Sequence, residues 1–260
     1  MILQDVCAKL EEHSPLRYMA EWDNSGLQVG GRQQEIRSIL ITLDVTDEAI
    51  DYAIDARADL ILSHHPLIFS ALKSVTEEDL CGRRILKLIR HHICCYAMHT
   101  NFDVMGMADA AADALGLKKC EVLEVTYEDE VSKEGFGRVG ELSSPMRAGE
   151  YAGHVKKSFS LDHVVFYGDR DALIERVAIC PGSGRSMAPA VLLSGADLYV
   201  TGDMGHHDAL DLTEQGLCVV DAGHYGVEKL FVPYMEEFLH RECGEMKVIT
   251  YPGKAPGEIL

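Results

Sequence analysis

The chain has 260 residues, of which 47% are hydrophobic and 25% are charged, and its formal net charge is −18. This composition is typical of a folded globular protein and excludes disorder as a description of the whole chain. Such an acidic chain repels nucleic-acid backbones, so we expect no general nucleic-acid binding, although local positive charge could still hold a small anion. No apolar run reaches the ~18 residues of a membrane span. The acidic N-terminus does not resemble a signal peptide, so we expect a cytoplasmic protein without membrane association.

Eight cysteines are spread over the chain, and no two of them form a Cys-x-x-Cys motif. Most lie in apolar runs that are typical of strands or helices. We therefore expect reduced thiols that act as small buried hydrophobic side chains.

Short β-rich runs alternate with helical runs along the chain. The first half predicts helices over 1–13, 47–58, 79–92 and 107–115, and strands over 36–45, 59–63 and 93–98. Thr46 is placed to cap the second helix and Gly116 to stop the fourth. The second half predicts strands over 122–127, 136–142, 163–168, 175–180, 197–201, 217–222 and 246–251, and helices over 147–158, 186–194, 206–215 and 226–242. This alternation predicts α/β layers on largely parallel sheets.

Residues of the types that bind metals follow four of the predicted strands. They are His64 with His65, His99 with Asp103, Asp203 with His206 and His207, and His224 with Glu228. In open α/β sheets, ligands bind beyond the carboxyl ends of the strands. The four strand ends therefore bring imidazoles and carboxylates toward one edge of the sheet.

The pair His64 and His65 leaves an apolar strand directly, and Pro66 favours extended backbone before it. Adjacent side chains of extended backbone point to opposite sides. The pair therefore suits two ions lying side by side better than one shared ion.

Three more candidate ligands have plain structural alternatives. Asp103 is either a ligand or the cap of the following helix. His224 and Glu228 are four residues apart, which places them on one helix face. Their alternative is a capping imidazole beside a solvated carboxylate. A carboxylate can bridge two cations, and imidazole binds several divalent metals.

Three histidines are candidates for a catalytic role: His99 and His207 as proton shuttles, and His206 as a residue that orients substrate. Asp203 could instead cap the helix that begins near His206.

The loop that contains Gly182, Ser183 and Gly184 lies between a predicted strand and a predicted helix. Its backbone N–H groups could bind an anionic substrate. The alternative is a simple tight turn, because no Gly-Lys-Ser/Thr of a P-loop follows.

Taken together, the motifs resemble those of a known family. SHHPLIF (63–69), HTNFD (99–103), TGDMGHH (201–207) and GHYGVE (223–228) closely resemble the NIF-three-like, YbgI-type dinuclear metal-centre family, often named GTP cyclohydrolase I type 2 homologues. WDNSGLQVG (22–30) and CPGSG (180–184) are similar to family motifs as well. The resemblance runs in order through nearly the whole chain.

The resemblance implies an α/β fold of two similar, intertwined domains with ligands at the carboxyl ends of strands. With the acidic break at 124–134, we expect a first lobe over 1–124, completed by 227–260, and a second over 125–226. It also implies a homohexamer and two divalent ions per chain, Zn, Fe or Mn. The ligands it implies are His64, His65, Asp103, His224 and Glu228, with Glu228 bridging the ions.

Two functions of different kinds follow. The first is metal-assisted hydrolysis of a nucleotide-like substrate, either at a purine ring, as in a cyclohydrolase, or at a small phosphoester. The second is a metal-binding chaperone or regulatory scaffold without turnover.

Overall fold

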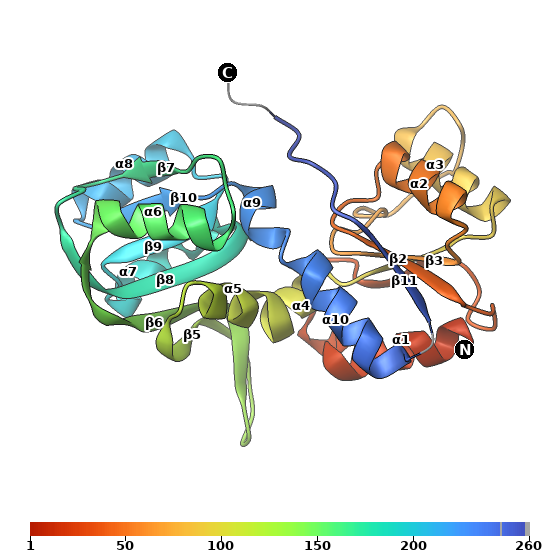
Figure 1. Cartoon of the computed structure of the whole chain (residues 1–260), viewed down its shortest axis with the longest axis horizontal. Coiled ribbons are helices and arrows are strands. Elements are labelled where there is room, and N and C mark those ends of the chain that lie inside the picture. Colours follow the sequence, from red (N-terminus) through yellow and green to blue (C-terminus); the bar gives the residue numbers. More distant parts are fainter. Residues whose placement is uncertain (245, 258–260) are drawn as a thin grey trace. The chain divides into compact units, whose positions relative to one another are not determined.

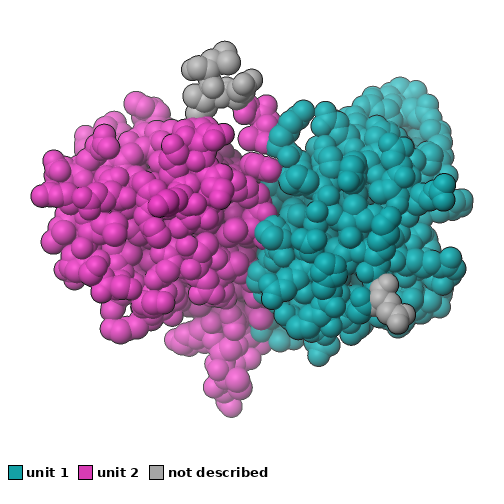
Figure 2. Space-filling view, in the orientation of Figure 1, with its two compact units in different colours: residues 1–102, 231–254 teal, residues 103–230, 255–260 magenta. Residues whose placement is uncertain are grey.

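The computed structural model describes residues 1–244 and 246–257, which divide into two compact units (Figures 1 and 2). Unit 1 consists of Met1–Phe102 and Phe231–Lys254, and unit 2 consists of Asp103–Leu230 with the residues from Ala255 onward. Unit 1 is therefore built from two separated segments of the chain. Within the described residues, no helix is long and apolar enough to cross a membrane.

The boundaries between the units lie at 102/103 and 230/231, whereas the sequence predicted them near 124 and 227. The first boundary lies earlier because Lys118–Glu128 pairs with Lys133–Arg147 in the sheet of unit 2. The acidic stretch expected to separate the lobes instead contains the turn of this hairpin. There the Asp129 carboxylate accepts the backbone N–H groups of Val131 and Ser132, both at 2.8 Å.

Unit 1 is a five-stranded sheet with helices on both faces (Figure 1). Its strands are β1 (Gly26–Val29), β2 (Ser38–Thr42), β3 (Leu60–Ser63), β4 (Cys94–Ala97) and β11 (Lys247–Tyr251), in the order β1-β4-β3-β2-β11. Its helices are α1 (Leu3–His13), η1 (Leu16–Tyr18), α2 (Asp47–Ala56), α3 (Leu80–Arg90), α4 (Thr100–Phe102) and α10 (Phe231–Cys243). The sheet is parallel except for β1, which runs antiparallel to β4.

The alternation of side chains along the strands explains the layers of unit 1. Leu40, Ile61 and Cys95 belong to one apolar core with residues of α2 and α3. The residues between them, such as Ile39 and Tyr96, are equally buried and so point to the other face of the sheet. Thr46 caps α2 as predicted, because its side chain accepts the Ala49 N–H at 3.0 Å.

Unit 2 has a six-stranded sheet in the order β5-β6-β8-β9-β10-β7. Its strands are β5 (Lys118–Glu128), β6 (Lys133–Arg147), β7 (Val165–Tyr167), β8 (Leu173–Ser183), β9 (Leu198–Gly202) and β10 (Cys218–Asp221). Its helices are the π-helix η2 (Asp103–Met107), α5 (Ala108–Ala114), α6 (Ala148–Ser158), η3 (Gly184–Met187), α7 (Ala188–Ser194), α8 (His206–Glu214) and α9 (His224–Glu228). One apolar core joins the sheet to α5 and α6, and a second core joins its other face to α7 and α8.

The expectation of largely parallel sheets is confirmed for unit 1 and wrong for unit 2. In unit 2 only the pairs β8–β9 and β9–β10 are parallel, while β5–β6, β6–β8 and β10–β7 are antiparallel. Strands β5 and β6 are joined by a tight turn with no crossover helix, and antiparallel pairing follows from such a connection.

The single helix predicted over 226–242 is two helices, α9 and α10. Pro233 has no backbone N–H to give to a carbonyl in the preceding turn, so an uninterrupted helix cannot pass through it. In the first turn of α10 the missing N–H costs nothing. The break at Lys229 and Leu230 is also where the chain passes from unit 2 back to unit 1.

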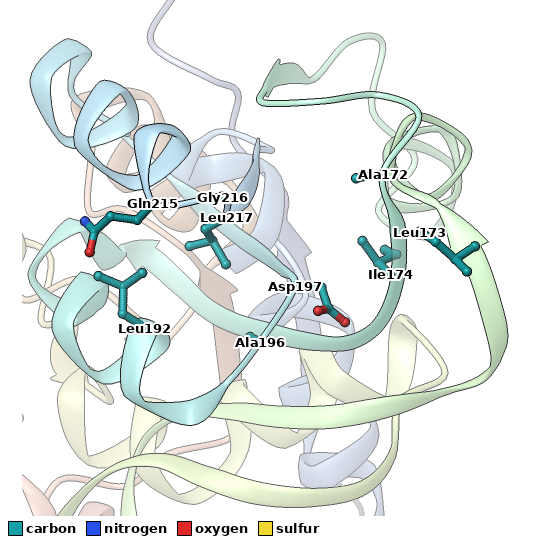
Figure 3. A pocket seen from close by; sticks show the side chains of 9 residues that line it. All are labelled: Ala172, Leu173, Ile174, Leu192, Ala196, Asp197, Gln215, Gly216 and Leu217. Carbon is teal, nitrogen blue, oxygen red and sulfur yellow. The ribbon is translucent and has the colours of Figure 1, made fainter.

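A cavity of about 300 Å³ lies in unit 2 at the amino ends of β9 and β10 (Figure 3). Asp197 and Leu217, which precede these two strands, line it together with Leu192 and Ile174. The Asp197 carboxylate already accepts the backbone N–H groups of Glu175 and Arg176. Because the candidate ligands follow the carboxyl ends of the same strands, this cavity is not at the candidate site.

Cys120 should be the first cysteine that iodoacetamide alkylates in the folded protein, because it is exposed while the other seven are buried or half-buried. Partial burial and the nearby carboxylates Asp109 and Asp113 raise the pKa of its thiol. Since the thiolate reacts, the rate should reach half its maximum above the midpoint of about pH 8.5 that an ordinary thiol gives. Mass spectrometry of the labelled chain measures this rate against pH. Removal of the fast phase in Cys120→Ser supports the assignment, and a midpoint at or below about pH 8.5 contradicts the raised pKa.

Candidate metal centre

Unit 1 gathers three histidines at one edge of its sheet. His64 and His65 directly follow β3, and His99 follows β4 by two residues. One ring nitrogen of each histidine lies within 4.8 Å of those of the other two. The ring centroids of His64 and His65 are 4.9 Å apart, and those of His65 and His99 are 5.5 Å apart. The sequence placed these residues at strand ends, and the parallel pairing of β3 and β4 brings them together.

Each of these imidazoles has its Nδ1 atom held by an oxygen. His64 Nδ1 donates to the Met98 carbonyl at 2.7 Å. His65 Nδ1 lies 2.8 Å from Asp44 Oδ1, and His99 Nδ1 lies 2.7 Å from Asp23 Oδ1. These oxygens can only accept when the carboxylates are ionised, so Nδ1 carries the proton and the lone pair of the neutral ring is on Nε2.

The two carboxylate partners come from strand ends at the same edge. Asp44 follows the carboxyl end of β2. Asp23 precedes β1, and because β1 is antiparallel to β4, with Gly26 opposite Ala97, its amino end lies at this edge. Neither residue was predicted to have a role. Asp44 lies near the end of the strand predicted over 36–45, and Asp23 lies in the motif WDNSGLQVG (22–30), but strand β1, which brings Asp23 to this edge, was not predicted.

Asp23 is the most heavily hydrogen-bonded carboxylate of this cluster. Its side chain is 0% exposed. Burial by itself raises its pKa, but hydrogen bonds from His99 and Thr100 outweigh burial and hold the pKa of Asp23 well below its ordinary value. An ionised Asp23 therefore fixes both the orientation and the tautomer of His99.

Unit 2 pairs an imidazole with a buried carboxylate at the carboxyl ends of its parallel strands. His224 follows β10, and its Nε2 lies 2.9 Å from Oε2 of Glu228, one turn later on α9. His224 Nδ1 lies 2.8 Å from Asp203 Oδ2, beyond the end of β9. Glu228 is buried, and α9 begins at Gly223 without a side-chain cap. The alternative of a capping imidazole with a solvated carboxylate is therefore wrong.

The absence of a side chain at Gly182 leaves room for His224 and Glu228. A Cβ atom at Gly182 would lie 2.3 Å from Glu228 Oε1 and 3.6 Å from His224 Nε2. The backbone φ of +70° at Gly182 also lies in the left-handed region. A glycine is therefore required where β8 passes the carboxylate.

Asp103 opens the π-helix η2 in the same unit. Burial raises the pKa of the Cys180 thiol to about 12, and the charges of Asp103 and Glu228 both contribute to this rise. Both carboxylates therefore act on the same thiol at the end of β8. Asp103 lies within a helical stretch that runs from α4 through η2 into α5, and the N-cap position of α5 is Met107, so the capping alternative for Asp103 is wrong.

Comparison with known proteins identifies the chain. A family model described as Duf34/NIF3 (NGG1p interacting factor 3) matches residues 1–256. The chain belongs to this family. A GTP cyclohydrolase 1 type 2 homolog of Clostridium perfringens is 36% identical over 264 residues, which cover 100% of both chains. The structure of a Bacillus cereus protein related to NIF3 has a TM-score of 0.91 at 26% identity, covering 100% of this chain and 99% of that one.

The resemblance read from the motifs is thus confirmed, and so is the fold class. Protein ybgI matches with a TM-score of 0.85, at 21% identity and with coverage of 99% and 100% of the two chains, which supports the fold alone. This NIF3-family chain is an α/β protein with two mixed sheets.

The other candidate residues of this NIF3-family chain lie nearby in unit 2 with less definite roles. His206 and His207 begin α8, are exposed, and have ring centroids 5.1 Å apart. Among the described residues, neither belongs to a group that could hold a metal. Ser183 is exposed, whereas the Gly184 N–H donates to Thr201 Oγ1 at 3.0 Å inside the unit. Their catalytic and substrate-binding roles stay predictions.

A second cavity of unit 2, of about 340 Å³, adjoins His224. Lys229 lines it and is the one lysine or arginine among its described lining residues. The ammonium donates to the Ser160 carbonyl at 3.0 Å, and partial burial lowers the pKa of Lys229. Lys229 was not predicted from the sequence, although its position directly after Glu228 was a signal.

Proposed function

We propose that this NIF3-family chain binds two divalent cations through the histidines of unit 1 and the carboxylates and histidine of unit 2, and that it hydrolyses a small, anionic, nucleotide-like substrate. The proposed ligands are His64, His65, Asp103, His224 and Glu228, with Glu228 as the bridge. One observation carries the proposal. Four imidazoles, three in unit 1 and one in unit 2, have Nδ1 held by a carboxylate or carbonyl oxygen, as metal-ligating histidines do.

The donor set fits a divalent transition metal. It combines imidazole nitrogens with carboxylate oxygens, which suit Zn, Fe or Mn. The 2.9 Å between His224 Nε2 and Glu228 Oε2 is close to the ~3 Å between two ligands that each lie about 2.1 Å from one ion. No cysteine belongs to this set, which argues against a closed structural zinc site.

The positive charge of such a site would explain how an acidic chain can attract an anionic substrate. Two divalent cations with the carboxylates of Asp103 and Glu228 give a local charge of roughly +2. A small anion is then attracted to the site although the whole chain carries a net charge of −18.

The chemistry divides between the ions and the chain. When bound, two divalent cations supply positive charge for an anionic group and lower the pKa of water. His99, oriented by Asp23, would move a proton at Nε2. Lys229 would hold a negatively charged part of the substrate in the cavity beside His224.

Substitution of Gly182 by Ala should weaken zinc binding by about tenfold or more, because the new methyl group displaces the Glu228 carboxylate. Competition with a chromophoric chelator measures this affinity. Gly195→Ala is the matched control, since Gly195 has a φ of +69° but nothing within 4 Å of its would-be Cβ. Equal zinc affinity in the two variants would show that Glu228 does not need this space for metal binding.

The proposed function is tested first by metal content. Protein purified without chelator and without a nickel column should carry close to two ions per chain by mass spectrometry, and a His65→Ala/Glu228→Gln variant should lose them. The loaded protein is then incubated with GTP, and formate and phosphate release are measured separately.

Formate release supports a cyclohydrolase, and phosphate release alone supports a phosphatase. Two bound ions without release of either product from GTP or phosphoesters would favour the chaperone or scaffold. No bound metal and no uptake of Zn, Mn or Fe would overturn the proposal. The hexamer implied by the resemblance is a separate prediction, which sedimentation equilibrium tests by measuring the mass of the assembly.

A further inference from the structure

Unit 1 exposes two large aromatic side chains next to its histidine cluster. Trp22 is 62% exposed and Phe69 is 53% exposed. Their ring centroids are 6.1 Å apart, with the ring planes tilted by 48°. Exposed aromatic rings that lie together are a feature of binding sites, because each leaves a large apolar area in water.

Both rings also contact His99. The centroid of Trp22 lies 6.0 Å from that of His99 and the centroid of Phe69 lies 6.3 Å from it, in edge-on arrangements of 76° and 71°. The aromatic pair is therefore part of the surroundings of the histidine cluster, which it contacts through His99.

Hydrogen bonds hold the backbone that carries each ring. Trp22 directly precedes Asp23, the buried carboxylate bonded to His99 and Thr100. Phe69 directly follows Ile68, whose carbonyl accepts from Asn24 Nδ2 at 2.6 Å and whose N–H donates to Gln28 Oε1 at 2.9 Å. The two loops are thus tied to each other, and the exposure of both rings is a property of the folded unit.

We propose that Trp22 and Phe69 bind a planar heteroaromatic ring of the substrate. This inference rests on the proposed function, in which the anionic part of the same substrate is held at the metal ions. Aromatic side chains stack on any flat heteroaromatic ring through its π-face. Two neighbouring rings beside His99 are large enough to bind one such ring, whereas a macromolecular partner needs a patch of several hundred Å².

Trp22 is the sole tryptophan of the chain, so its fluorescence reports on this site alone. Guanosine monophosphate and ribose 5-phosphate are titrated separately into metal-free and zinc-loaded protein, with correction for absorption by the base. We expect saturable quenching by guanosine monophosphate in both forms. Its affinity should exceed that of ribose 5-phosphate, measured by calorimetry, by about tenfold.

The Phe69→Leu variant retains the fluorescent Trp22. It should bind guanosine monophosphate about tenfold more weakly, while its affinity for ribose 5-phosphate should stay the same. Tyr52→Leu, at a residue that is 45% exposed on α2, is the matched control and should change neither affinity. Equal affinity for the two phosphates in the unmodified protein would overturn the inference.

Two further outcomes separate this inference from the proposed function. If the chain takes up no metal but still binds guanosine monophosphate better than ribose 5-phosphate, the ring site stands and the proposed function fails. If Trp22 emission changes on dilution without ligand, together with the sedimentation coefficient, a second copy of the chain covers the rings and the inference is wrong.

Discussion

The Glu228→Gln protein should bind at most one divalent ion per chain, and its hydrolytic rate should fall by more than about 100-fold. This loss is larger than the roughly 10- to 100-fold loss that usually follows substitution of a residue that only supports a metal ligand. Glutamine keeps the shape of the side chain but removes its negative charge. A neutral amide is a much weaker ligand for a divalent cation than a carboxylate and does not bridge two of them well. Glu228 is buried against His224 and Gly182, so its carboxylate is held in one position.

Mass spectrometry of the metal content and the initial rate of product release test this together. Glu214→Gln is the matched control, because Glu214 is an exposed residue of α8 in the same unit. Its metal content and rate should equal those of the unmodified protein. Full occupancy by two ions in Glu228→Gln would refute the bridging role, and full activity with one ion would refute the two-ion proposal.

The positions of the candidate ligands were predictable because they follow strands, and the strands were easy to recognise. His64 and His65 directly follow a short apolar run and His224 follows another within three residues, and parallel pairing carries such ends to one edge. Their hydrogen-bonding partners were harder to find. Asp203 was predicted as a strand-end residue of a metal-binding type or as a helix cap, not as a partner of His224, and it bonds His224 across the ends of two neighbouring strands.

The fold was predictable where local patterns decide it. Helix α3 lies within the predicted range 79–92, and α6 within 147–158, because their apolar residues repeat at helical spacing. Strand β1 was missed because it has only four residues, Gly26–Val29, of which the two in the middle are half-buried. Its place at the edge of the sheet depends on pairing with β4, about 70 residues later, which no local pattern contains.

Substitution of Asp23 by Asn should have the largest effect on stability, lowering the free energy of unfolding of unit 1 by about 3–5 kcal/mol. Oδ1 of Asp23 accepts from His99 Nδ1 and the Asn24 N–H, both at 2.7 Å. Oδ2 accepts from Ser25 Oγ at 2.8 Å and from the N–H and Oγ1 of Thr100 at 3.1 and 2.5 Å. An asparagine must place its NH₂ group at one of these two positions. At either position it meets at least two donors, and buried donors without an acceptor are costly.

The effect should depend on pH in a direction set by the low pKa of Asp23 in the folded state. Such a carboxylate adds stability above its unfolded pKa of about 3.9, and this stability is lost as the pH falls toward the folded pKa. The gap between the two proteins in urea unfolding, followed by circular dichroism, should therefore be widest near neutral pH and narrow below about pH 4. Asp55→Asn, at an exposed position of α2, should unfold like the unmodified protein at each pH. A gap that stays constant into acid would mean that the ionisation of Asp23 contributes nothing to the stability of the folded unit.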